Sequence, residues 1–240
     1  MRSMRNWLTY NGVPLTNYGV YISGSGVFNA PARDQESIAV PGRNGELTID
    51  NGRFENITVE YPAFIYRGFD LNVDGLRNFL LSQRGYKRLK DSYHPNEYRL
   101  ARWSGNFTTD VEERLYAGNF TLTFDCMPQR FYEEGDQPIE ITSASSSILN
   151  SGMFAAKPLI RAYGTGSFSI GGVAVSISAA DTYTDIDCEL QEAYKDTLAT
   201  NKNAYVTLTN GKFPQLNPGT NAVTITGLSK IIVYPRWWRL

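Results

Sequence analysis

The chain has 240 residues, enough for one large β domain or two smaller ones, and carries 23 Lys and Arg against 24 Asp and Glu. This near-neutral charge excludes a strong attraction to nucleic acid or to an anionic membrane, so neither sequence-specific nucleic-acid contact nor membrane insertion is expected. No apolar run approaches the roughly 18 residues of a membrane span, and residues 1–10 lack the apolar core of a signal peptide, which predicts folding in a cytoplasm.

The composition favours β structure, because aromatic residues and Gly are frequent while helical periodicity is rare. The first predicted element is a β-hairpin over Trp7–Leu15. It turns at Asn11-Gly12, the pair best suited to a turn with two positive φ angles. A short strand over Tyr18–Ser23 follows.

Residues 29–53 are polar and rich in turn signals. Asn44-Gly45 and Asn51-Gly52 both favour hairpins. The segment therefore predicts an extended β arm, whose own core is too small to hold it in place. Such an arm needs a partner surface.

A long strand is predicted over Phe54–Tyr66, because apolar residues alternate there with polar ones. One helix is predicted over Leu71–Arg84, with Asn72 as its N-cap and Gly85 as the left-handed residue that ends it. Its apolar stripe consists of Val73, Leu76, Phe79 and Leu80. Packing against its own sheet is favoured over binding a partner.

Three further strands complete the first half of the chain. Tyr86–Asp91 and Glu97–Trp103 flank a turn at His94-Pro95-Asn96. The clearest alternation follows, where Phe120, Leu122 and Phe124 share one face. This strand is predicted to end at Met127-Pro128.

Residues 133–152 change in composition, with acidic residues, Pro and a run of Ser and Thr. They predict a linker between an N-terminal domain, residues 1–132, and a C-terminal domain, residues 153–240. The second domain has many short alternating strands separated by turn signals. This spacing predicts a sandwich or jelly roll.

The end of the chain predicts a rigid turn that leads into a hairpin. Pro214 and Pro218 restrict the turn. The two strands are expected over Val223–Thr226 and Ile231–Tyr234. Trp237-Trp238 lies almost at the terminus, and two large aromatic side chains there are expected to be docked on the domain.

The sequence contains few residues that would indicate a catalytic site. His94 is the sole histidine, and neither a Ser elbow nor a Cys-His signature accompanies it. No enzyme activity, cofactor or resident metal is therefore expected. Cys126 and Cys188 lie in alternating strand patterns and are predicted to be reduced, buried thiols.

Two acids could form a constellation. Asp185 and Asp187 share one strand face, and the alternating Ile186 and Cys188 predict that this face points to solvent. A weak calcium site is the remaining alternative.

Tyrosines leave a second class of function open. Tyr93, Tyr98, Tyr183 and Tyr194 could stack on sugars, as aromatic side chains do in carbohydrate-binding sandwiches. The alternative function is therefore a carbohydrate-binding module that recognises host cell-surface glycans.

Taken together, five stretches resemble the distal tail protein (Dit) of siphophages, the baseplate hub of long non-contractile tails. They are Trp7–Gly12, Pro41–Gly45 followed by a strand and Asn51-Gly52, Asp187–Tyr194, Phe213–Asn221 and Pro235–Trp238. The likeness spans nearly the whole chain in order and spacing, and the last two stretches are the specific ones.

The resemblance implies a mainly β fold. It implies an N-terminal β-sandwich or split-barrel domain with one α-helix and an extended β arm, followed by a C-terminal galectin-like jelly-roll sandwich. Some relatives carry an additional carbohydrate-binding module inserted in the C-terminal domain. Here residues 153–240 leave room for the sandwich alone.

The resemblance also implies a function. The chain would be a structural component of a phage or prophage tail tip, a hexameric ring that connects the tail tube to the tail-tip adhesin or tail-associated lysin. Its partners would be copies of itself, the major tail tube protein, that adhesin or lysin, and receptor-binding proteins. The expected location is the virion tail tip, after assembly in the bacterial cytoplasm.

Two sets of residues follow from this resemblance. The arm at the oligomer interface would use Arg33, Ile38, Val40, Arg43, Asn44, Leu47 and Ile49. The structural motif of the C-terminal domain would comprise Phe213, Pro214, Pro218, Gly219, Asn221, Arg236, Trp237 and Trp238.

Overall fold

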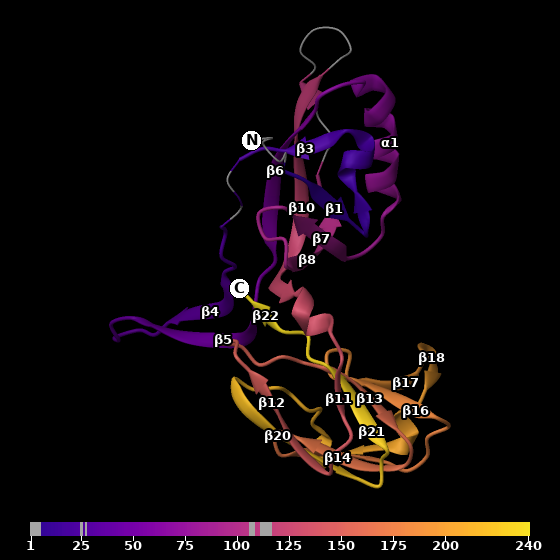
Figure 1. Ribbon diagram of the computed structural model, residues 1–240. Coiled ribbons are helices and arrows are strands. Elements are labelled where there is room, and N and C mark those ends of the chain that lie inside the picture. The colour runs from indigo at the N-terminus through magenta and orange to yellow at the C-terminus, as the bar shows by residue number, and fades with distance from the viewer. Residues whose placement is uncertain (1–5, 25, 27, 106–108, 111–116) are drawn as a thin grey trace. The chain divides into compact units, whose positions relative to one another are not determined.

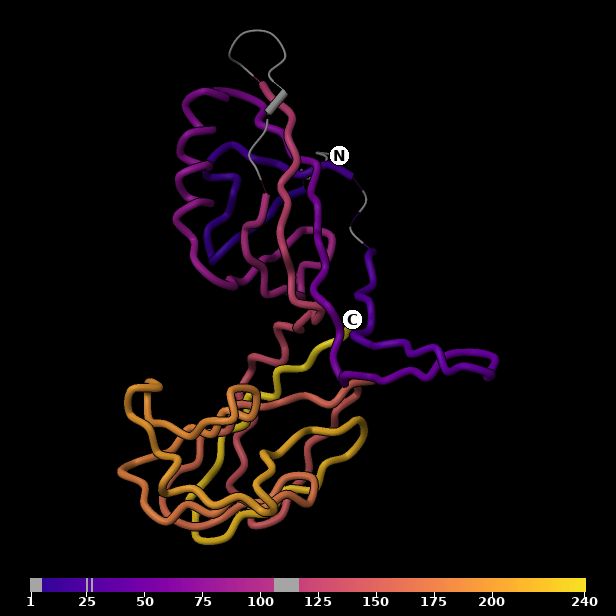
Figure 2. Tube along the Cα trace, turned by 180° about the vertical axis from the view of Figure 1, so that it is seen from behind, coloured from indigo at the N-terminus to yellow at the C-terminus, as the bar shows by residue number. Residues whose placement is uncertain are grey.

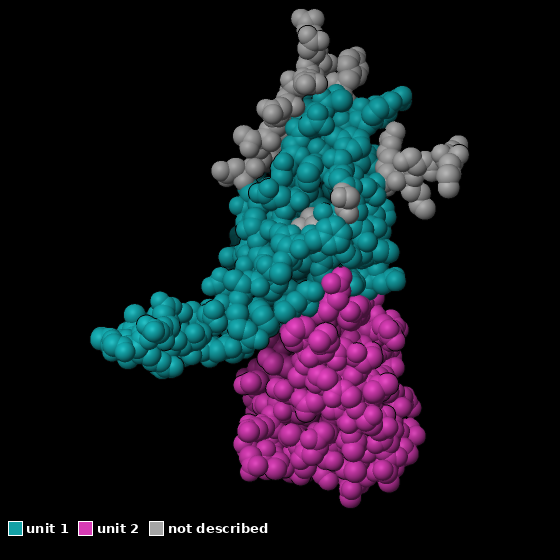
Figure 3. Space-filling model, turned by 90° about the vertical axis from the view of Figure 1, so that its left-hand side faces the viewer, with its two compact units in different colours: residues 1–130, 240 teal, residues 131–239 magenta. Residues whose placement is uncertain are grey.

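The computed structural model describes residues 6–24, 26, 28–105, 109–110 and 117–240 (Figure 1). The chain divides into two compact units, residues 1–130 with Leu240, and residues 131–239 (Figure 3). Each unit has its own hydrophobic core.

The first unit is built on an antiparallel sheet with the strand order β2-β1-β7-β8-β10-β6-β3, and β9 also pairs with β10. β4 and β5 form a separate two-stranded sheet. The elements are β1 (Leu8–Tyr10), β2 (Val13–Pro14), the 3-10 helix η1 (Leu15–Tyr18), β3 (Val20–Ile22), β4 (Arg33–Ala39), β5 (Glu46–Phe54), β6 (Ile57–Ile65), α1 (Phe69–Ser82), β7 (Lys87–Asp91), β8 (Glu97–Trp103), β9 (Thr109–Asp110) and β10 (Gly118–Tyr132).

The predicted N-terminal hairpin is confirmed. β1 and β2 pair around Asn11-Gly12, whose φ angles are 49° and 76°. The side-chain amide of Asn11 donates a hydrogen bond to Oε1 of Gln83 at 2.8 Å. The turn is thereby tied to the residue that follows α1.

The predicted helix exists, but its ends differ from the prediction. The N-cap is Gly68, whose φ of 63° turns the chain into the helix earlier than expected. Asn72 is therefore not the cap, and its amide donates to the carbonyl oxygen of Gly68 at 2.9 Å. Gly85 is left-handed, with a φ of 67°, but lies beyond the C-cap residue Gln83.

The helix packs on its own sheet, which confirms the favoured interpretation. Every residue of the predicted apolar stripe belongs to, or packs against, the core of the first unit. Gly118 on β10 permits this approach, because a Cβ there would lie 2.4 Å from the ring of Phe69. Any larger side chain at Gly118 would push the start of α1 off the sheet.

The strand β10 alternates buried and partly exposed residues, as predicted, but it is longer than expected. The prediction that it ends at Met127-Pro128 is wrong, because it continues to Tyr132. β6 pairs with β10 only as far as Cys126. Pro128 lies beyond that ladder, where its missing N–H removes no hydrogen bond from it.

The second unit is a sandwich of two antiparallel sheets, as the strand spacing predicts. One sheet has the order β11-β21-β13-β16-β17-β18 and the other β12-β20-β14-β15-β19. The inward side chains of both form one core. The elements are η2 (Glu133–Asp136), β11 (Ile139–Ile141), β12 (Ser145–Asn150), β13 (Leu159–Tyr163), β14 (Gly166–Ile170), β15 (Val173–Ile177), β16 (Tyr183–Asp187), β17 (Glu192–Lys195), β18 (Thr197–Asn201), η3 (Asn203–Tyr205), β19 (Val206–Leu208), η4 (Thr209–Gly211), β20 (Gly219–Thr226), β21 (Lys230–Tyr234) and β22 (Trp238–Arg239).

Residues 133–152, whose composition suggests a linker, form η2, β11 and β12 of this unit. β11 pairs with β21, and β12 pairs with β20 along its whole length. The polar composition has a structural reason: β12 is an outer strand of its sheet, and Ser145 and Ser147 are exposed there. A strand with one open edge and one solvated face tolerates a run of Ser.

The C-terminal strands do not form the predicted hairpin. The apolar alternation is as expected, since Val223 and Ile225 are buried. However, β20 and β21 lie in different sheets, and the chain crosses between them at Gly227, which has a φ of 79°. This corner is tight, because a Cβ on Gly166 would lie 2.4 Å from the carbonyl oxygen of Thr226.

Candidate assembly surface

The predicted arm is present as the two-stranded ribbon of β4 and β5 (Figure 2). Ile38 pairs with Leu47, and Glu36 pairs with Ile49, in an antiparallel register. Directly paired residues point to the same face, and so do residues two apart. Ile38, Leu47 and Ile49 therefore share one face, and the strand periodicity places Val40 on it too. Glu36, opposite Ile49, is a charged residue on this otherwise apolar face.

This apolar face is open to solvent. Ile38 is 43% exposed, Val40 38%, Leu47 46% and Ile49 44%. None of the four belongs to either hydrophobic core. The opposite face is polar, with pairs such as Ser37 and Thr48. The ribbon is thus amphipathic, yet its apolar face has no core of its own beneath it.

The root of the arm is held by ion pairs instead. Arg33 contacts Asp50 at 2.6 Å and lies over the ring of Phe54, 4.8 Å from its centroid. Arg53 contacts Asp34 at 2.5 Å. A register shift between residues 33 and 35 brings these side chains together.

Hydrogen bonds at the root also lower the pKa values of both carboxylates. That of Asp34 falls because the amide of Asn51 and then Arg53 donate to it. That of Asp50 falls because the backbone N–H of Gly52 donates to it at 2.8 Å. These contacts join β4 to β5 at the root of the arm.

The predicted arm residues are therefore only partly brought together. The four apolar residues share one face. Arg33 lies at the root, in its ion pair, whereas Arg43 and Asn44 lie in the turn at the tip. The backbone N–H of Arg43 donates to the carbonyl oxygen of Val40 at 3.1 Å, which closes that turn.

The C-terminal motif is a set of internal contacts. Asn221 donates from its amide to the carbonyl oxygens of Asn217 at 2.8 Å and Gly219 at 3.0 Å, and its Oδ1 accepts the N–H of Asn217 at 2.9 Å. Pro214 is buried, whereas Pro218 and Gly219 are exposed in the turn, and Phe213 packs against the core. One side chain therefore holds residues 217–219.

The terminal tryptophans are docked, as predicted. Both pack against the core of the second unit. Trp238 stacks on Phe154, with ring centroids 4.5 Å apart, and donates its indole N–H to the carbonyl oxygen of Ala155 at 3.0 Å. The chain approaches Gly135 closely here: a Cβ on Gly135 would lie 2.4 Å from the backbone nitrogen of Trp237, so a larger residue does not fit.

The prediction that Asp185 and Asp187 face solvent is wrong. Both are 2% exposed. Arg161 makes a bidentate pair with Asp185 at 2.7 and 2.9 Å, and Arg236 makes one with Asp187 at 2.8 Å. Alternation correctly separates the two faces of β16, but it does not reveal that arginines cover the outer one.

These pairs explain Arg236 in the C-terminal motif. Arg236 has a left-handed φ of 57°, and its backbone N–H donates to the carbonyl oxygen of Gly135 at 2.8 Å. Burial works to raise the pKa of Asp187, but hydrogen bonds from Arg236 and from the N–H groups of Leu190 and Glu189 outweigh it and lower the pKa. The carboxylate is thus fully committed inside the unit.

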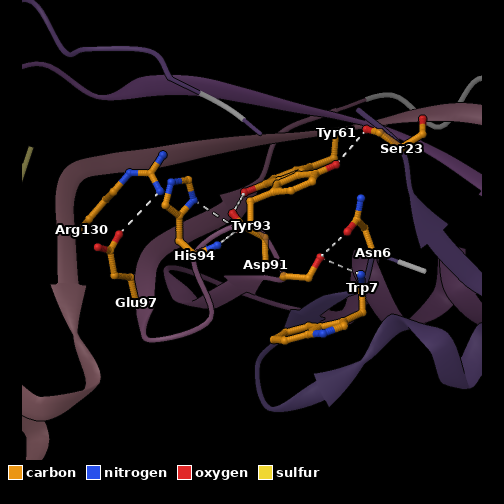
Figure 4. A network of polar contacts seen from close by, with 10 residues as sticks. Asn6, Trp7, Ser23, Tyr61, Asp91, Tyr93, His94, Glu97 and Arg130 are labelled. Atoms are coloured by element: carbon orange, nitrogen blue, oxygen red, sulfur yellow. Dashed lines mark hydrogen bonds and ion pairs between the residues drawn. The ribbon is translucent and has the colours of Figure 1, made fainter. Parts of the chain in front are cut away.

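His94 lies in a polar network of the first unit rather than beside a nucleophile (Figure 4). Its Nδ1 is 3.4 Å from Asp91, which also accepts the backbone N–H of His94 at 2.9 Å and the hydroxyl of Tyr61 at 2.8 Å. Burial, and then the charge of Asp91, raise the pKa of Tyr61. The arrangement holds a turn between β7 and β8.

The four tyrosines considered for sugar stacking are divided between the two units. Tyr98 is buried, and the hydroxyl of Tyr93 donates a hydrogen bond to the backbone carbonyl oxygen of Ser23; both tyrosines belong to the first unit. Tyr183 and Tyr194 lie in the second unit, on β16 and β17.

The remaining predictions concern thiols, metals and membranes. Cys126 and Cys188 are free and buried, as predicted, and burial raises the pKa of Cys126 to about 12. The residues described here contain no cluster of His, Cys, Asp or Glu that could hold a metal ion. Within the same part of the chain, no helix combines the length and hydropathy that a membrane span requires.

Comparisons with protein-family models and with curated proteins find no match. Among solved structures, the chain is similar to the crystal structure of SPP1 Dit (gp 19.1), described as a paradigm of the hub adsorption apparatus in phages that infect Gram-positive bacteria. The TM-score is 0.73 at 18% identity, over 96% of this chain and 98% of that chain. The predicted fold class is confirmed: the chain has the two-part β fold of a Dit hub protein.

Proposed function

We propose that the chain is a structural subunit of a phage tail tip. It forms a hexameric ring that joins the tail tube protein to the tail-tip adhesin or tail-associated lysin, with receptor-binding proteins as further neighbours. Ring formation is assigned to residues 1–132, and contact with the other tail proteins to residues 153–240. Assembly takes place in the host bacterial cytoplasm.

The observation that carries this proposal is the amphipathic arm. We expect a second surface to cover its apolar face, because an isolated two-stranded ribbon has only marginal stability in water. Complete burial of an aliphatic side chain contributes about 1.5–3 kcal/mol. The share still exposed on Ile38, Val40, Leu47 and Ile49 would contribute roughly 1 kcal/mol each.

A second copy of the chain is the partner that this geometry favours. An arm that docks on a different surface of an identical neighbour makes a head-to-tail interface, which generates a ring when the rotation closes. Each copy then both donates and receives one arm. The likeness to a hub protein over nearly the whole length of both chains supports this choice.

The proposal is tested with a matched pair of variants on the two faces of the arm. Ile38→Asp with Leu47→Asp places charges on the apolar face, and Ser37→Asp with Thr48→Asp places the same charges on the polar face. Both pairs lie directly opposite each other across β4 and β5. We expect the unchanged chain and the polar-face variant to form rings, and the apolar-face variant to stay monomeric.

The measurements are native mass spectrometry and negative-stain imaging, with the tail tube protein added in a second series. Deletion of residues 33–50 should likewise abolish rings while both units stay folded. Compact monomers of the unchanged chain in both series would contradict the proposal. Rings formed by the apolar-face variant would contradict the role of the arm.

A further inference from the structure

The second unit contains a hollow of about 430 Å³ at a place where turns of both sheets meet. Gly171 follows β14, Gln191 lies between β16 and β17, and residues 211–217 approach β20. Its volume lies within the range of about 300–1,000 Å³ that small-molecule sites occupy. The hollow belongs to the second unit alone.

The loop that forms one wall has two different sides. Pro214 and Leu216 are buried, and Leu216 exchanges backbone hydrogen bonds with Ala156 at 2.9 and 3.0 Å. The residues that alternate with them, Gln215 and Asn217, are exposed and line the hollow. The inward residues therefore fix the loop, while the outward ones present side chains.

A second support comes from Asn221, which holds residues 217–219 as described above. The backbone N–H of Gly171 donates to the carbonyl oxygen of Ala222 at 3.0 Å. A Cβ on Gly171 would lie 3.3 Å from the carbonyl oxygen of Gln215 and 3.4 Å from Oδ1 of Asn221. Glycine allows these two walls to approach each other closely.

The opposite wall is held by the buried ion pair. Asp187, fixed by Arg236, accepts the backbone N–H groups of Glu189 at 3.0 Å and Leu190 at 3.1 Å. The next residue, Gln191, has a left-handed φ of 57°. A non-glycine residue in this region is strained, and such strain concentrates at ligand sites. Residues of the stretches Asp187–Tyr194 and Phe213–Asn221 thus line one hollow.

The side chains presented there have unused hydrogen-bonding capacity. Gln191, Lys212, Gln215 and Asn217 are exposed, and their side chains hydrogen-bond to no residue that the structure describes. Phe213 adds a half-buried ring to the lining, and no lining residue carries a carboxylate. The hollow therefore presents free amides, one ammonium group and an aromatic ring on a rigid frame, so that binding a ligand would order few additional groups.

We propose that this hollow binds a saccharide unit that carries a carboxylate or a phosphate group. Side-chain amides both donate to and accept from hydroxyl groups. The ring of Phe213 offers an apolar surface to the C–H face of a sugar. The ammonium group of Lys212 favours an anionic substituent. The site gives the chain direct glycan contact, and it does not depend on ring formation.

The test is saturation-transfer NMR on the full chain with glucose, glucuronic acid and glucose 6-phosphate as probes. We expect transfer to both acidic sugars at a Kd of about 1 mM or tighter, and weaker transfer to glucose. Gln191→Gly combined with Gln215→Ala should weaken binding by about tenfold. Glycine suits the left-handed position, so this variant should melt like the unchanged chain.

Two further variants complete the design. Lys212→Gln should remove the preference for the acidic sugars over glucose. Gln137→Ala, an exposed amide of the same unit away from the hollow, should change nothing. The saccharide proposal is overturned by absence of transfer from all three sugars, by transfer that persists in the double variant, or by complete displacement of glucuronic acid by equimolar inorganic phosphate. None of these outcomes bears on whether rings form.

Discussion

The arm and the C-terminal loop, residues 212–218, are similar in composition but differ in how their side chains are used. Both are polar segments punctuated by Pro, Gly and Asn, and an Asp–Arg ion pair can be compared in each unit: Arg33–Asp50 in the arm, and Arg236–Asp187 in the second unit. In the arm the pairs are exposed and the apolar side chains face solvent. In the loop the polar groups are used internally, and the apolar side chains pack on the sandwich. Turn-rich composition therefore occurs both in a hairpin with an exposed apolar face and in a loop that packs on its own unit.

The largest expected difference comes from breaking one ion pair in the arm and one in the second unit. Asp187→Ala leaves Arg236 without its buried partner and leaves two backbone N–H groups unpaired. We expect a loss of about 3–5 kcal/mol from the second unit. Asp50→Ala breaks an exposed pair in the arm and should leave the melting of both units unchanged.

Chemical denaturation with a separate reporter for each unit measures both changes. If Asp187→Ala proves harmless, the buried pair does not stabilise the second unit. If Asp50→Ala unfolds the first unit, the arm is part of its core after all. Either result would remove the contrast between the two regions.

A smaller effect is expected at the docked terminus. Trp238→Ala removes a half-buried ring that stacks on Phe154 and one hydrogen bond to Ala155. We expect the second unit to lose about 2–3 kcal/mol, less than for a fully buried tryptophan. Leu198→Ala, an exposed side chain of the same unit, is the control and should have no measurable effect. Equal melting of the two variants would show that Trp238 serves a partner rather than the fold.

The smallest effect concerns acid. The pKa of Asp187 is lower in the folded chain than in the unfolded chain, where an Asp has a value near 3.9. Its stabilising contribution is therefore fully present above about pH 4 and is lost as the pH falls through the folded value. Acid unfolding of the second unit, followed by circular dichroism, should be less steep in Asp187→Asn than in the unchanged chain. The arm variant Asp50→Asn should follow the unchanged curve, and identical curves for all three would exclude this linkage.

Much of the fold could be predicted, because local signals agreed with the tertiary structure. The Asn11-Gly12 turn, the apolar stripe of the helix and the alternation on β10 all depend on neighbours in the sequence. The wrong predictions concern features that are determined by residues far apart in the sequence. Nothing near Asp187 shows that Arg236, far along the chain, will cover it, and nothing near Thr226 shows that β20 and β21 join different sheets.

The interaction surfaces divide in the same way. The arm could be recognised from its hairpin signals and its lack of a core. The hollow could not, because its walls come from three separate turns and its amides are ordinary polar residues in the sequence. The signal that was available is indirect: one of the two most specific stretches, Phe213–Asn221, supplies residues to the lining of that hollow.

The exposed ribbon has a consequence for the free chain, before a partner covers the arm. A hairpin with two open edges and an apolar face is the shape from which fibrous aggregates grow. The ribbon also carries Arg33, Asp34, Glu36, Glu46, Asp50 and Arg53 along its length. Charges flanking an unavoidable apolar strand act as gatekeepers against indiscriminate stacking. Four of these charged residues, Arg33, Asp34, Asp50 and Arg53, also form the ion pairs at the root of the arm. We expect them to oppose aggregation of the chain before its apolar face is covered.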